Sequence, residues 1–92
     1  MSEFRLSKTH SMQRAELRET ARALADRLEA QHGMRAQWQG DDVVAIKGSG
    51  VEGRLSIDDR QIAVDVKLGL LASAFQGKLR AEIQRYLDDN IS

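Results

Sequence analysis

The chain contains no cysteine, no excess of charge of either sign and no long hydrophobic run. The absence of cysteine excludes disulfides, thiolate metal sites and a cysteine nucleophile, and it is compatible with a reducing compartment. The 14 basic residues balance the 14 acidic ones, whereas domains that bind polyanions usually carry a visible basic excess. We therefore expect no nucleic-acid partner.

No apolar stretch approaches the ~18 residues that a membrane span requires. The first residues, from Met1 to Leu6, lack the apolar region of a secretory signal. These features predict a protein of the cytoplasm with no transmembrane segment. Its 92 residues suffice for one domain with a modest core and leave no room for a second. We therefore predict a single domain over residues 1–92.

The pattern predicts a helix over residues 12–31, with Ser11 as its N-cap and Gly33 as its stop, because glycine readily adopts the left-handed conformation that ends helices. One face of this helix is apolar, and a different face carries three arginines. These arginines could contact phosphates or could simply be solvated, and the neighbouring acidic residues favour solvation. The arginines are Arg14, Arg18 and Arg22, and the apolar face comprises Leu17, Ala21, Leu24, Ala25 and Leu28.

Five short segments have the patterns of strands. Four of them alternate apolar and polar residues, as strands with one buried face do, and residues 43–47 are a short apolar run. One precedes the helix, and four follow it in quick succession, separated by short turns rich in glycine and aspartate. Such turns join antiparallel neighbours, because parallel strands need a crossover of a dozen or more residues. The segments cover residues 3–7, 34–39, 43–47, 51–57 and 62–68.

The last segment is predicted to be a long amphipathic helix. Its apolar residues recur every fourth position: Leu71, Phe75, Leu79, Ile83 and Leu87. This spacing forms one apolar stripe, which needs a second surface to cover it. The predicted fold class is therefore α+β, a two-layer β-α-β-β-β-β-α domain with both helices on the apolar face of one antiparallel sheet. We expect the first strand to pair with the last, in the spatial order 1-5-4-3-2.

Residues 48–53 match the pattern G-x-G-x-x-G. A dinucleotide-binding loop of this kind follows a strand and opens a helix. Here the glycines lie between two predicted strands, so a glycine turn is the better interpretation.

The two histidines, His10 and His32, flank the first predicted helix. At 1.5 Å per residue they lie ~30 Å apart, so within one monomer they cannot share a metal ion or form a catalytic pair. The pairs Asp41-Asp42 and Asp58-Asp59 fall at turns, where aspartate bonds nearby backbone amides. No nucleophile, metal-ligand set or cofactor loop emerges from the sequence. We therefore expect no enzymatic activity, no metal and no cofactor.

A groove between the last helix and the sheet is the candidate site for a ligand or partner. Its candidate residues are Trp38, Leu71, Phe75 and Leu79. Trp38 alternates in phase with the apolar residues of its strand but lies near a hairpin tip, so both a core position and a contact surface stay open.

Several short pieces, taken in order, form a pattern that extends over nearly the whole chain. They are Thr9-His10-Ser11 before an alanine-rich helix, Trp38-Gln39-Gly40-Asp41, Gly50-Val51-Glu52-Gly53, Val64 to Leu71, Phe75, Ile83 and Leu87-Asp88. Together they resemble the polyhydroxyalkanoic acid system proteins, a family of short bacterial proteins. The resemblance implies a role near polyhydroxyalkanoate storage granules or their synthesis genes, and it brings no established reaction. The order of elements also resembles a shortened helix-grip fold, whose larger members often enclose an apolar ligand.

Two functions follow from these observations. The first is a non-enzymatic binding or interaction protein of the polyhydroxyalkanoate storage system, in the cytoplasm and associated with granules. Its candidate partners are granule proteins, the granule surface and a second copy of the chain. The alternative is a small carrier of an apolar acyl ligand held between the C-terminal helix and the sheet. The short chain argues against the closed cavity of ~300 Å³ or more that ligand sites usually provide.

Overall fold

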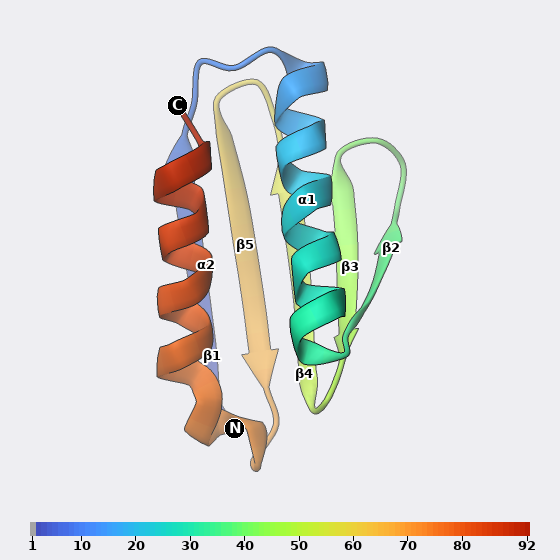
Figure 1. The fold of residues 1–92 in the computed structure, drawn as a ribbon, viewed down its shortest axis with the longest axis vertical. Coiled ribbons are helices and arrows are strands. Elements are labelled where there is room, and N and C mark those ends of the chain that lie inside the picture. The colour runs from blue at the N-terminus through green and yellow to red at the C-terminus, as the bar shows by residue number, and fades with distance from the viewer. Residues whose placement is uncertain (1) are drawn as a thin grey trace.

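The computed structural model describes residues 2–92, which form one five-stranded antiparallel sheet with two helices over one face (Figure 1). The strands are β1 (Ser2–Thr9), β2 (Arg35–Trp38), β3 (Val43–Gly48), β4 (Val51–Ile57) and β5 (Gln61–Leu68). The helices are α1 (Arg14–His32) and α2 (Gln76–Asn90), and a 3₁₀ turn, η1 (Ala72–Phe75), precedes α2. The strand order β1-β5-β4-β3-β2 confirms the predicted α+β fold and the pairing of the first strand with the last.

The register of the sheet brings apolar side chains of all five strands into one row. Leu6, Val64, Leu55, Val44 and Trp38 are successive partners across the sheet. The first four are exposed by 4% or less. The alternation in the sequence therefore gives one continuous apolar face, which the helices must cover.

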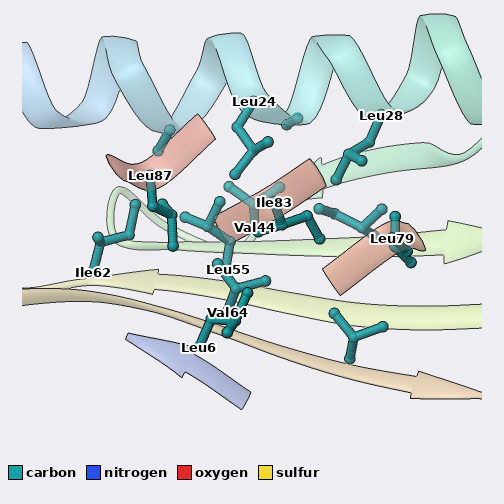
Figure 2. Close-up of a cluster of buried hydrophobic side chains, with 14 of the residues drawn as sticks. Leu6, Leu24, Leu28, Val44, Leu55, Ile62, Val64, Leu79, Ile83 and Leu87 are labelled. Atoms are coloured by element: carbon teal, nitrogen blue, oxygen red, sulfur yellow. The ribbon is translucent and has the colours of Figure 1, made fainter. Parts of the chain in front are cut away.

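The two helices divide that face between them. α1 packs over the β2 and β4 side of the sheet, whereas α2 packs over β1 (Figure 1). Side chains of both helices point into the space above the sheet, among them Leu24 and Leu28 of α1 and Ile83 of α2 (Figure 2). No polar or charged side chain of residues 2–92 is buried there. The core is thus an apolar layer closed by both helices.

The start of α1 differs from the prediction. The helix begins at Arg14, and its N-cap is Gln13, which makes no side-chain capping bond. The backbone N–H and the hydroxyl of Ser11 both donate to the carbonyl of Ser92, over 3.2 and 3.0 Å. The Ser11 hydroxyl is therefore engaged with the C-terminus, and the predicted N-cap was wrong. The predicted stop is confirmed, because Gly33 adopts a left-handed φ of 66°.

The start of the last helix also differs from the prediction. Leu71 lies in a turn before η1 and is 94% exposed, so its assignment to the apolar stripe was wrong. A 3₁₀ turn has about 3.0 residues per turn instead of 3.6, so the residues before Gln76 leave the phase of the helix that follows. The buried stripe of α2 consists of Leu79, Ile83 and Leu87.

The glycine-rich pattern forms a two-residue hairpin turn between β3 and β4. Ser49 and Gly50 have positive φ angles of 55° and 76°, as the turns that match the twist of a tight hairpin require. This confirms the interpretation of residues 48–53 as a glycine turn.

These differences predict that alanine substitutions of Leu79 and Leu71 lower the free energy of unfolding by very different amounts. Leu79→Ala leaves a cavity in the core and should lower the free energy of unfolding by about 2–5 kcal/mol. Leu71→Ala removes an exposed side chain and should change it by less than about 0.5 kcal/mol. Urea denaturation of both variants beside the native chain measures the contrast. Equal losses of stability in the two variants would show that Leu71 belongs to the core.

Candidate functional site

The exposed apolar surface is concentrated at the connection between β5 and η1. Leu70 is 81% exposed and Leu71 is 94% exposed, and no other large hydrophobic side chain of residues 2–92 is exposed. The two leucines lie at one end of the molecule, at the foot of Figure 1, where the loop leaves β5. We call this pair the apolar tip. These adjacent exposed leucines are the candidate apolar contact surface of residues 2–92.

Hydrogen bonds fix the backbone on both sides of the apolar tip. The N–H of Gly69 donates to the carbonyl of Gly50 over 2.8 Å, and the N–H and hydroxyl of Ser73 both donate to the carbonyl of Gly69 over 2.9 Å. The hydroxyl of Ser2 donates to that of Ser73 over 3.1 Å. The tip is therefore tied to the β3–β4 hairpin and to the start of β1. The two exposed leucines therefore lie on a loop whose backbone is held by hydrogen bonds on both sides.

A polar contact next to the tip joins the two helices. The Nε2 atom of His32, at the end of α1, lies 2.8 Å from a carboxylate oxygen of Glu82 on α2. The ring of Phe75 packs edge-on against the His32 ring, with the ring centres 5.3 Å apart. The hydroxyl of Ser49 donates to the backbone carbonyl of His32. These contacts give His32 a structural role at the junction of α1, α2 and the β3–β4 hairpin.

A groove of about 700 Å³ runs between α1 and α2 and includes His32 and Glu82. Charged side chains line it, among them Arg27, Lys78 and Arg85. The Arg27 guanidinium lies over the ring of Tyr86, 5.8 Å from its centre. Such a lining suits polar groups better than the hydrocarbon part of an acyl ligand.

The structure separates the four residues of the predicted groove. Trp38 is half-buried on β2, at the edge of the sheet opposite β1, whereas α2 packs over β1. Leu79 is 1% exposed in the core, and Phe75 is half-buried against His32. Leu71 alone is freely exposed, and it has Leu70 as its neighbour. Leu70 was not among the residues predicted from the sequence. Its position next to Leu71 was a usable signal, because a helical stripe accounts for only one of two adjacent leucines.

A model of the family described as "Putative polyhydroxyalkanoic acid system protein" matches residues 4–91 of the 92-residue chain. The chain belongs to this family. The match reaches from β1 to the residue that follows α2, and it confirms the resemblance seen in the sequence. No curated protein and no solved structure matches the chain.

The arginine face of α1 binds the hairpin loops of this polyhydroxyalkanoic acid system protein. The Arg14 guanidinium contacts the carboxylates of Asp42 and Asp59, at 2.6 and 2.7 Å. The hydrogen bonds and charges of these carboxylates, that of Asp59 above all, raise the pKa of Arg14. Nε of Arg18 donates to the backbone carbonyl of Asp41 over 3.3 Å. Two of the three arginines thus hold the β2–β3 and β4–β5 loops and are not merely solvated.

Of the two aspartate pairs, Asp58 bonds the backbone of its own turn, as expected. One carboxylate oxygen of Asp58 accepts hydrogen bonds from the backbone N–H groups of Arg60 and Gln61, over 2.7 and 2.8 Å. These two bonds stabilise the charged form and lower the pKa of Asp58 below its ordinary value of 3.8. The backbone carbonyl of Asp58 lies 2.7 Å from Nε2 of His10. His10 therefore takes part in the same turn.

No three histidine, aspartate or glutamate side chains within the described part of the chain gather closely enough to hold a metal ion. Neither α1 nor α2, the helices of residues 2–92, is long and apolar enough to cross a membrane.

The lowered pKa of Asp58 predicts how acid affects the fold. A carboxylate whose pKa is lower in the folded state adds stability above the unfolded pKa, and this contribution is lost as the pH falls through the folded pKa. The native chain should therefore be more stable than Asp58→Asn at pH 7, and the difference should shrink as the pH falls through the lowered pKa of the folded state. Urea unfolding across this pH range measures the difference.

Asp26→Asn, at an exposed position of α1, is the matched control for the loss of one carboxylate. It removes one exposed carboxylate outside the turn, so it separates the loss of a charge from the loss of the turn's hydrogen bonds. If the Asp58→Asn difference persists unchanged into strong acid, the ionised carboxylate is not what stabilises the turn.

Proposed function

We propose that this protein is a non-enzymatic binding protein of the polyhydroxyalkanoate storage system, which acts in the cytoplasm and contacts the granule through its apolar tip. The family match supports the connection with polyhydroxyalkanoate. The observation that carries the mode of contact is the exposure of Leu70 and Leu71 on a loop held by hydrogen bonds.

The free energy available at the apolar tip suits reversible attachment. Transfer of one exposed leucine side chain into an apolar phase contributes about 2 kcal/mol. The two leucines together give about 4 kcal/mol, or roughly a thousandfold in partition at most. An anchor of this size is comparable in kind to a single lipid chain, which gives marginal and reversible binding. The protein would exchange between granule and solution and would not form a permanent coat.

Contact through the tip also leaves the core intact. The stripe of α2 is buried by the sheet, so insertion of that helix into a granule would expose the apolar face beneath it. The tip lies outside the core at one end of the molecule (Figure 1). The folded protein can therefore use Leu70 and Leu71 without any rearrangement.

The packing favours this role over an acyl carrier. The space between α2 and the sheet is filled by Leu79, Ile83 and Leu87, each exposed by 1% or less. A ligand held there would have to displace these side chains, and the loss of their packing would cost several kcal/mol.

Co-sedimentation with polyhydroxybutyrate particles tests the proposal. We compare the native chain with the double variant Leu70→Ser/Leu71→Ser, which removes the apolar tip and leaves the core unchanged. The bound fraction at a fixed particle surface should fall at least about tenfold, because the apolar transfer free energy of both side chains is lost. Circular dichroism establishes that the variant is folded.

Ala23→Ser/Ala30→Ser is the control, since it introduces two serines at exposed positions of α1. It should sediment with the particles as the native chain does. Native granules and protein-free particles are compared in parallel, because binding to native granules alone would assign the contact to a granule protein. Undiminished binding of the tip variant to both preparations contradicts the proposed contact.

A further inference from the structure

The face of the sheet opposite the helices carries two rows of charge. The first row follows the register across the sheet as Glu3, Lys67, Glu52 and Lys47. The second row is Arg5, Asp65 and Arg54. The sign of the charge alternates along each row, so these strands present opposite charges to one another. On β2, however, the partner of Lys47 is Arg35, which adds a like charge beyond the end of the first row.

The sign also alternates between the rows, because each of β1, β5 and β4 carries two opposite charges two residues apart. A hollow of about 820 Å³ lies over both rows, and Phe4, Gly53 and Val66, which separate the rows, also line it. The helices cover the other face, so this face has no covering layer within residues 2–92 (Figure 1).

The charged groups that form ion pairs within the sheet remain largely exposed to solvent. Arg5 lies 2.9 Å from Asp65, but their side chains are 58% and 42% exposed. Lys47 and Glu52 are 3.8 Å apart and are exposed by 73% and 66%. Exposed pairs of this kind contribute roughly 0–1 kcal/mol each. The same groups therefore stay available for a second set of partners above the sheet.

The pattern is self-complementary about a two-fold axis that runs across the strands, midway between the rows. Rotation about this axis exchanges the rows, so Glu3 faces Arg5 of the copy, Lys67 faces Asp65, and Glu52 faces Arg54. Each of the three contacts occurs twice, as in any two-fold interface. We propose that the open face of the sheet is the interface of a homodimer, in which two copies dock face to face in this arrangement.

The sheet edges are less suited to a second copy. α2 packs over the edge strand β1. A helix is ~10–12 Å wide, whereas neighbouring strands lie ~4.8 Å apart, so strand pairing between two β1 edges would bring two α2 helices into collision. The other edge strand, β2, has only four residues, which gives a short template for pairing. The open face is free of both restrictions.

The size of the overlap makes the proposed dimer weak and dependent on salt. Five strands ~4.8 Å apart, overlapping over about five residues of ~3.3 Å each, give a footprint of roughly 400 Å² per copy. This is about half of the ~800 Å² per partner that stable complexes bury. The contacts are between exposed charges, so salt should screen them.

A charge-swap experiment tests the proposal by sedimentation velocity at low salt and high protein concentration. The basic variant Glu3→Lys/Glu52→Lys and the acidic variant Arg5→Glu/Arg54→Glu each place like charges opposite one another in a homodimer. Each variant alone should therefore be monomeric. An equimolar mixture restores opposite charges at all six contacts and should form a heterodimer. Dimerisation of the native chain should weaken at least about tenfold between low salt and 0.3 M NaCl.

The two variants also acquire opposite net charges, which could by themselves attract the variants to one another. A control variant tests this explanation. Arg22→Glu/Arg80→Glu changes the net charge as the acidic variant does, but at exposed positions on the helices. Because it keeps the native charges on the open face, it should dimerise with itself as the native chain does. With the basic variant it would place like charges at two of the six contacts, so the basic variant should stay monomeric in that mixture. The proposal is overturned if the native chain stays monomeric at millimolar concentration and low salt. A dimer that survives in both variants alone, or a mixture that stays monomeric, overturns it as well.

Discussion

The fold depends on covering one continuous apolar sheet face with two helices that approach it from different points of the chain. α1 covers the side of β2 and β4, and α2 covers β1, which β5 joins to the rest of the sheet. Because Leu79, Ile83 and Leu87 are buried in the core, α2 has no exposed apolar stripe that a partner could contact. The two surfaces proposed above lie outside this cover, on the loop before α2 and on the uncovered face of the sheet.

The sequence predicts the elements well where local pattern and packing agree. Alternation and short turns identified the strands and their antiparallel pairing, and the stripe of α2 required the sheet that precedes it. The errors occur where distant contacts or a change of helical period intervene. Ser11 bonds the carbonyl of Ser92, which local capping rules do not anticipate, and the 3₁₀ turn before Gln76 places Leu71 outside the stripe.

The candidate site was harder to predict than the fold, because spacing identifies residues on one face of an element but does not place elements beside one another. Trp38 was grouped with Leu71 and Phe75, yet Trp38 lies on the edge strand β2, whereas Leu71 and Phe75 precede α2, which packs over the opposite edge strand β1. The rows of charge were likewise hidden. Glu3 and Lys67 read as ordinary solvent-facing residues until the register places them opposite one another, since sequence alternation fixes the face of a side chain and not its cross-strand neighbour.

The two proposed surfaces constrain each other geometrically. A two-fold axis across the strands reverses the strand direction of the second copy, and the apolar tip lies at the end of β5, beside the start of β1 (Figure 1). The tips of the proposed dimer therefore point in opposite directions. One flat granule surface can engage only one of them, so dimerisation adds no avidity on a single surface, for avidity requires simultaneous engagement of both sites. In the proposed dimer the second tip points away from the surface that the first one contacts, so binding to that surface would depend on one tip alone.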